Sequence, residues 1–92
     1  MAFGEKIRVA REAAGIRLNA FARSVGVSAA YWSRIERELE KPPSNQLVEA
    51  SANKLGLDRD GVYIAAGRLP PDIQANIGVA VRLYRRAHHV SG

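Results

Sequence analysis

The chain has no cysteine, and its two histidines, His88 and His89, are adjacent near its C-terminal end. Without cysteine it can form neither disulfide bonds nor thiolate metal sites. Neighbouring histidines point to different sides of a helix, which makes them a poor pair of metal ligands. A nucleophile elbow and a glycine-rich phosphate loop are missing as well. We therefore expect no enzyme activity, no cofactor and no bound metal ion.

Long apolar runs are also missing from the sequence. The run at residues 62–66, one of the longest, has five residues, whereas a helix needs about 20 apolar residues to cross a bilayer. Charged side chains occur throughout the first twenty residues, which does not fit a secretory signal peptide. We therefore expect no association with a membrane.

The net charge of +5 is distributed unevenly along the 92 residues. Residues 1–37 carry seven basic and three acidic side chains, residues 38–81 carry four basic and six acidic ones, and residues 82–92 add three arginines. Basic segments flanking an acidic middle favour a polyanion-binding face over a uniformly basic coat. A solvated, slightly basic surface would have the same composition, so charge alone leaves nucleic-acid binding open.

Residues 18–37 read as two short helices joined by a tight turn. Apolar residues recur at helical spacing on both sides of Gly26, which can adopt the left-handed conformation that ends a helix. Ser28 supplies a hydroxyl that caps the second helix. This pattern predicts a helix-turn-helix whose second helix, residues 28–38, has one face free to enter a DNA groove. The apolar side chains expected in its core are Phe21, Ala22, Val25, Val27, Trp32, Ile35 and Leu39.

At these residues the chain resembles the Cro/phage-repressor-type (XRE-family) helix-turn-helix transcriptional regulators. The resemblance rests on Phe21-Ala22, on the turn Gly26-Val27-Ser28 and on YWSRIER at residues 31–37, and it covers residues 3–73. It implies an all-α fold, with a five-helix lambda-repressor-like DNA-binding domain that here has an additional C-terminal helix. It also implies a cytoplasmic protein of bacterial or phage origin that associates with the nucleoid when bound to DNA.

The remaining helices are expected on either side of this motif. A first helix is closed by Gly15, a fourth lies between Ser44 and Gly56, and a fifth begins at Leu57 and stops at Gly67. The apolar stripe of the first helix is Phe3, Ile7, Ala10 and Ala14, and the fifth helix is expected to fill the core with Val62, Tyr63, Ile64 and Ala65.

Residues 68–92 follow the predicted DNA-binding domain of residues 1–67. Pro70-Pro71-Asp72 restarts the chain, and a sixth helix with an apolar stripe and a basic end follows. We predict that this helix packs against a second copy of the chain; the alternative is that it folds back on its own core. Its apolar stripe consists of Ile73, Ile77, Val81 and Tyr84.

The start of the recognition helix has small side chains, which let the helix axis lie deep in the major groove. Arg34 is the best candidate for a bidentate contact with a guanine, Ser33 suits a base or a phosphate, and Arg37 suits a phosphate. For each arginine the alternative is a solvated surface charge. The candidate DNA-binding residues are Arg17, Asn19, Ser28, Ala29, Ala30, Ser33, Arg34, Arg37 and Lys41.

The resemblance assigns further roles. In this family an arginine at the position of Arg11 pairs with the glutamate at Glu36 and locks the first helix to the recognition helix. A serine or threonine cap and a phosphate-binding glutamine usually stand where this chain has Arg17 and Leu18, so Asn19 either caps, binds DNA or simply begins the helix. A glycine is common where Glu38 stands.

These observations predict a sequence-specific regulator that binds double-stranded DNA, acts as a repressor, and inserts residues 28–38 into the major groove as a homodimer on an inverted repeat. The rival class is a protein-interaction module built on the same domain, such as an antitoxin, with a regulatory protein partner. Structured RNA is disfavoured because its major groove is too narrow for a helix.

Overall fold

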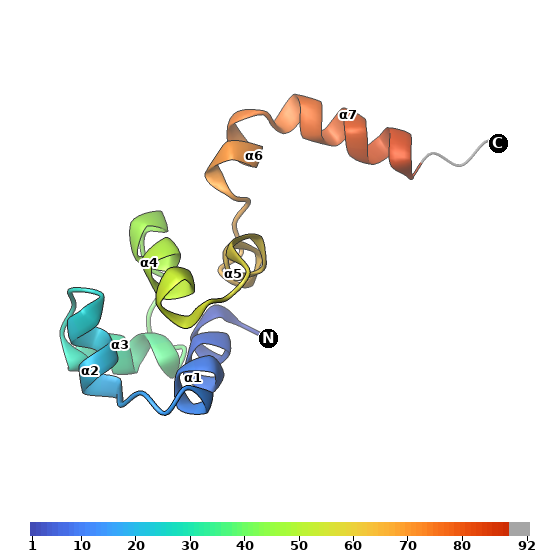
Figure 1. Cartoon of the computed structure of the whole chain (residues 1–92). Coiled ribbons are helices and arrows are strands. Elements are labelled where there is room, and N and C mark those ends of the chain that lie inside the picture. Colours follow the sequence, from blue (N-terminus) through green and yellow to red (C-terminus); the bar gives the residue numbers. More distant parts are fainter. Residues whose placement is uncertain (89–92) are drawn as a thin grey trace.

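The computed structural model describes residues 1–88, which form seven α-helices and no strand (Figure 1). The predicted all-α fold is thus confirmed. Residue His89, named with His88 as a poor metal ligand, lies outside the described residues. The helices are α1 (Phe3–Ala13), α2 (Leu18–Ser24), α3 (Ala29–Glu36), α4 (Asn45–Leu55), α5 (Arg59–Ala65), α6 (Pro71–Ala75) and α7 (Ile77–Ala87).

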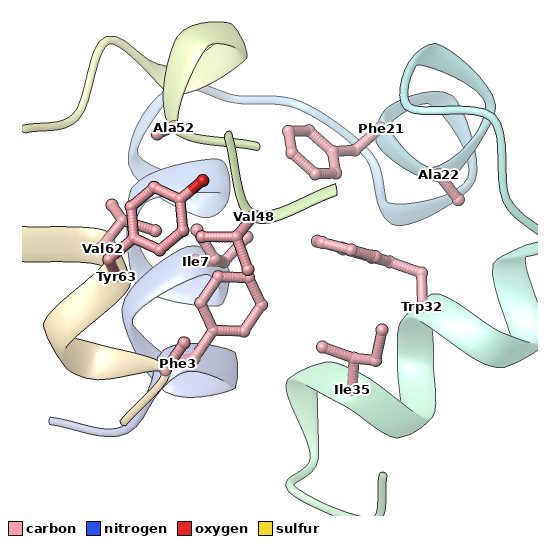
Figure 2. Close-up of a cluster of buried hydrophobic side chains, with 11 residues drawn as sticks. Phe3, Ile7, Phe21, Ala22, Trp32, Ile35, Val48, Ala52, Val62 and Tyr63 are labelled. Carbon is pink, nitrogen blue, oxygen red and sulfur yellow. The ribbon is translucent and has the colours of Figure 1, made fainter. Parts of the chain in front are cut away.

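Helices α1 to α5 enclose one hydrophobic core (Figure 2). Trp32 of α3 lies at its centre and is fully buried, with its ring 5.1 Å from that of Phe21 on α2. Burial of each large apolar side chain contributes about 1.5–3 kcal/mol, so this cluster is the main stabilising feature of the domain. The core consists of Phe3, Ile7, Phe21, Ala22, Trp32, Ile35, Val48, Ala52, Val62, Tyr63 and Ala66.

The turn between α2 and α3 is built as the sequence predicts. Gly26 has a φ of +81°, a left-handed conformation in which a Cβ atom would be strained. Ser28 is the N-cap of α3, and its hydroxyl accepts a hydrogen bond of 3.1 Å from the Tyr31 backbone N–H. The two devices together fix the direction in which α3 leaves the turn.

Two residues expected in the core are exposed instead. Helix α3 ends at Glu36, and Glu38 has a φ of +62°, so the chain reverses before Leu39, which is 63% exposed. Ile64, which is 65% exposed, lies two residues after the buried Val62 and so points to the opposite side of α5. The first error came from continuing the stripe of α3 beyond its last turn, and the second from assigning four consecutive residues of one helix to the core.

The N-terminus of α1 packs closely against the C-terminus of α3. A Cβ atom added to Gly4 would lie 2.1 Å from the backbone oxygen of Ile35, so only glycine fits there. The N-cap of α1 is Ala2, which has no side chain to cap the helix. Glu38 supplies the missing acceptor, because its Oε1 receives a 3.0 Å hydrogen bond from the Glu5 backbone N–H.

The C-terminal segment extends away from the α1–α5 bundle (Figure 1). The sequence predicts one sixth helix here, but the segment forms two, α6 and α7, because Asn76 between them has non-helical backbone angles (φ −122°, ψ +37°). None of the described residues from 72 to 88 is buried. The stripe residues Ile77 and Val81 are 46% and 38% exposed, so α7 does not fold back on the core of its own chain.

Arg59 connects the bundle to the start of this segment. Its Nε lies 2.7 Å from Oε1 of Glu49 on α4, and its Nη1 lies 3.1 Å from Oδ1 of Asp72 on α6. Its guanidinium also lies 5.1 Å from the centre of the Tyr63 ring, and the Tyr63 hydroxyl donates a 2.7 Å hydrogen bond to Glu49. Arg59 therefore links the start of α6 to α4 and α5.

No helix in the described part of the chain combines the length and the hydrophobicity needed to cross a bilayer.

Candidate nucleic-acid interface

Helix α3 and its two cap residues carry most of the candidate DNA-binding residues. Ala30, Arg34 and Arg37 are exposed, while Ala29 and Ser33 are half-buried. Ala30, Arg34 and Arg37 follow one another at four- and three-residue spacing on the side opposite the buried Trp32 and Ile35, whereas Ala29 packs against the core. A helix with small residues at its start and arginines one and two turns later suits the major groove, where side chains reach the base edges.

The predicted pair of Arg11 and Glu36 connects the buried side of α3 to α1. The guanidinium donates two hydrogen bonds of 2.8 Å, from Nε and Nη2, to the two oxygens of the carboxylate. The Trp32 indole donates a third of 2.7 Å to Oε2 of Glu36. The hydrogen bond with Glu36 is the main cause that raises the pKa of Arg11. The family-implied structural role of the pair is confirmed.

A further bond ties this pair to the chain just before α2. Nη1 of Arg11 donates a 2.7 Å hydrogen bond to the backbone oxygen of Ile16. One guanidinium thus connects α1, the α1–α2 loop and α3. Because each of the three guanidinium nitrogens donates to the protein itself and both residues are buried, Arg11 and Glu36 are not available to DNA.

Arg34 forms an ion pair that the sequence did not indicate. Its Nε lies 3.0 Å from Oε1 of Glu40, in the loop that follows α3. The two side chains are 44% and 38% exposed, so the pair lies at the surface. The two residues are six positions apart and only the first is helical, so helical spacing could not bring them together. The reversal of the chain at Glu38 does so.

Arg37 lies at the end of α3, beyond Arg34. It is the C-cap residue, and its Nε donates a 3.3 Å hydrogen bond to the backbone oxygen of Ser33. This contact keeps the guanidinium along the side of α3. Lys41, in the loop before α4, is exposed.

Arg17 and Asn19 lie at the start of α2, and both are exposed. Arg17 occupies the N-cap position and forms no side-chain capping bond. Asn19 is the second residue of α2, so it is not a cap, and the other two readings of this residue stay open. The N-terminus of α2 therefore has backbone N–H groups without a side-chain acceptor, a geometry that favours an anion such as a phosphate.

The two glutamates that follow α3 have partners within the chain. Glu38 turns towards α1 and caps it, while Glu40 turns towards Arg34. Glu38 has a positive φ, a conformation that suits the glycine common at this position in the family. The capping role of its side chain had no signal in the sequence.

An open pocket of about 320 Å³ lies between the α2–α3 turn and the start of α4. Its lining includes two polar residues, Ser44 and Gln46. The hydroxyl of Ser44 accepts a 3.3 Å hydrogen bond from the Leu47 N–H and caps α4, as predicted. The other lining residues are Val25, Val27, Leu47 and Ala50.

Comparison with known proteins identifies relatives of this arrangement. The family described as "Helix-turn-helix domain" matches residues 2–62. An uncharacterized HTH-type transcriptional regulator, recorded from two strains of Mycobacterium tuberculosis, is 33% identical over 78 residues, which cover 85% of this chain. The match covers 55% of that regulator, so this chain spans about half the length of the curated relatives it matches.

Solved structures similar to this chain also come from regulatory proteins. A crystal structure of SinR, a master regulator for biofilm formation, in complex with DNA is 32% identical, with a TM-score of 0.60 over 65% of this chain and 95% of that one. The clp gene regulator ClgR from Corynebacterium glutamicum is 26% identical, with a TM-score of 0.61 over 94% and 89%. A chain of the SinR–SinI protein complex is 26% identical, with a TM-score of 0.60 over 95% and 79%.

Proposed function

The chain belongs to the Cro/phage-repressor-type (XRE-family) helix-turn-helix transcriptional regulators, and on that premise we propose that it binds double-stranded DNA sequence-specifically and represses transcription by occupying a promoter. The observation that carries the proposal is the anchoring of α3. Glu36 accepts three hydrogen bonds from within the bundle, so the opposite face of α3 is presented in a fixed orientation. The SinR structure solved with DNA supports the same ligand class.

The proposed contacts follow from the exposure of each side chain. Helix α3 enters the major groove, with Ser28, Ala29 and Ala30 at its leading end, where alanine methyl groups can meet a thymine methyl. Arg34 reads a guanine, and Ser33 bonds a base or a phosphate. The residues proposed to bind the phosphate backbone are Arg17, Asn19, Arg37 and Lys41, all of which are exposed.

The proposed DNA-binding domain is residues 1–67, and residues 68–92 supply the dimer contact. Ile77, Val81 and Tyr84 are exposed on one side of α7. Arg82 and Arg86 lie on the other side, Arg85 borders the apolar side, and α7 contains no acidic residue. Two copies packed through their apolar sides would keep Arg82 and Arg86 of the two chains apart. The dimer would read an inverted repeat with half-sites about one helical turn apart.

The experiment that tests the function is the selection of bound duplexes from a random pool, with the purified chain at near-physiological salt. Enrichment of a sequence with two-fold symmetry supports the dimeric repressor. Enrichment of a sequence without two-fold symmetry would support DNA binding by the chain but would contradict the proposed dimer. No enrichment by a folded chain would overturn the proposal.

A second candidate function is a protein-interaction module. The observation that favours it is the similarity to SinR in its complex with the protein SinI, together with the exposed apolar side of α7. In that case α7 binds a regulatory protein instead of a second copy. Loss of DNA enrichment, with formation of a stable complex between α7 and another protein, would favour this function over the first.

A further inference from the structure

We propose that Glu40 sets the base preference of the chain by orienting Arg34. Its carboxylate holds Nε of the arginine, so that the two terminal nitrogens of the guanidinium face the groove and bind a guanine. Glu40 itself would not contact the DNA and is therefore a positioning residue. The inference rests on the proposed function, since it requires that α3 read base edges.

The geometry of the guanidinium is the first argument. An arginine has five N–H donors in one plane, one on Nε and four on the terminal nitrogens. Glu40 engages Nε of Arg34 at 3.0 Å, and within residues 1–88 the chain forms no hydrogen bond with the terminal nitrogens. With the Arg34 side chain 44% exposed, these nitrogens are available to a ligand. They match the N7 and O6 acceptors of guanine in the end-on, bidentate geometry.

The backbone around Glu40 is the second argument, because the loop is fixed on both sides of it. The Leu39 N–H donates a 2.8 Å hydrogen bond to the backbone oxygen of Arg34, which closes the end of α3. Further along, Arg68 donates hydrogen bonds to the backbone oxygens of Pro42, at 2.8 Å, and of Pro43. The carboxylate of Glu40 is thus brought to Arg34 by a defined loop.

The exposure of the pair is the third argument. An ion pair at the surface contributes little to the stability of a fold. Its effect is on the orientation of Arg34, because a free arginine at the same position could swing to the nearest phosphate. The negative charge of Glu40 also repels phosphates, so the residue lowers affinity for DNA of any sequence while it raises preference for one base pair.

These opposite effects give a test with a Glu40→Gln variant, which keeps the size of the side chain and removes its charge. Affinities are measured for the selected duplex, for the same duplex altered at the base pair that Arg34→Ala no longer distinguishes, and for an unrelated duplex. We expect affinity for the unrelated duplex to rise, while discrimination at the Arg34 base pair falls about threefold. Discrimination at other positions should not change.

Glu12→Gln is the matched control. It removes the same charge from an exposed glutamate, whose partner is Arg8 on α1 at 3.4 Å. It should change affinity for all duplexes through net charge and leave discrimination intact. In the double variant of Arg34→Ala with Glu40→Gln, the second change should cause no further loss of discrimination, because the two residues act as one unit.

Two outcomes would overturn the inference alone. Glu40→Gln would either retain full discrimination at the Arg34 base pair, or lose discrimination equally at every position, as a purely structural change would. Failure of the proposed function has a different signature, because the unmodified chain would then enrich no sequence. That result would overturn both proposals before any variant was made.

Discussion

Arg11 and Glu36, twenty-five residues apart in the chain, face each other through two hydrogen bonds of 2.8 Å. Their side chains are only 9% and 2% exposed. A buried charge without a partner is strongly unfavourable, so each of these residues depends on the other. Because one belongs to α1 and the other to α3, their pairing makes the orientation of the recognition helix part of the folding of the domain.

Glu36→Gln should destabilise the chain by about 3–5 kcal/mol. The amide keeps the size of the side chain, but it removes the charge opposite Arg11 and replaces one of the acceptor oxygens by a donor. Urea unfolding followed by circular dichroism measures the change. Glu12→Gln, which removes an exposed carboxylate, is the control and should cost about 0.5 kcal/mol or less. Equal losses of unfolding free energy in the two variants would show that the buried pair of Arg11 and Glu36 contributes no more to stability than an exposed carboxylate.

Much of this arrangement could be predicted from the sequence because it depends on local signals. Gly26 and Ser28 define a turn and a cap within a few residues of each other, and the stripe of buried residues follows helical periodicity. The pair of Arg11 and Glu36 was accessible only through resemblance to a family. No spacing rule connects residues so far apart.

The features that the sequence did not predict depend on tertiary geometry. The pairing of Arg34 with Glu40 and the capping of α1 by Glu38 both result from the reversal of the chain after α3. Asn76, which divides the predicted sixth helix into α6 and α7, interrupts a stripe whose periodicity continues on either side. Periodicity reports which side of a helix is apolar and does not report whether the helix is continuous.

Variants at Glu38 should separate its backbone conformation from its side-chain bond. Glu38→Ala loses the hydrogen bond to the Glu5 N–H and keeps the left-handed φ of +62°. Glu38→Gly loses the same bond but adopts that φ without strain, so it should be more stable than Glu38→Ala by about 1 kcal/mol. Thermal unfolding measures the difference. At Glu40, where φ is not positive, glycine should be no more stable than alanine, and an equal advantage of glycine there would reject the explanation.

Arg34 and Arg37 should respond differently to truncation. Arg34→Ala should weaken binding to the selected duplex by about 1–3 kcal/mol and relax the preference at one base pair in each half-site. Arg37→Ala should weaken binding to all sequences to a similar degree and reduce the salt dependence, because a phosphate contact carries no sequence information. Repeating the duplex selection with each variant checks both expectations. An unchanged preference after Arg34→Ala would remove this residue from the base-reading role.

Stability should fall at acid pH through the carboxylates that surround Arg59. Hydrogen bonds from Tyr63 and then Arg59 lower the pKa of Glu49 below its ordinary value of 4.5, and a hydrogen bond from Arg59 lowers the pKa of Asp72 below 3.8. Because these values are depressed in the folded state, the stabilisation is complete above the unfolded values. It is lost as the pH falls through the folded ones.

Arg59→Gln should therefore flatten the dependence of unfolding free energy on pH between about pH 5 and pH 3. The unmodified chain should lose more stability over this interval, because Arg59 lowers the pKa of Glu49 and Asp72 in the folded state and protonation of these carboxylates removes that stabilisation. Urea titrations at several pH values give the slope. Arg8→Gln, which removes the exposed partner of Glu12, should leave the slope unchanged. A steeper slope in Arg59→Gln than in the unmodified chain would contradict the assignment.

Val81→Glu should prevent self-association through α7 while the bundle stays folded. Val81 lies on the apolar side of a helix that has no buried residue. A glutamate at this position would be solvated in the monomer but buried without a partner in the proposed dimer. Sedimentation of the unmodified chain, with and without the selected duplex, should show a dimer, and the variant should sediment as a monomer. Arg86→Gln, on the other side of α7, is the control and should remain dimeric. A strictly monomeric unmodified chain at high micromolar concentration, both free and on DNA, would reject the dimer. The exposed side of α7 would then be a surface for a different protein.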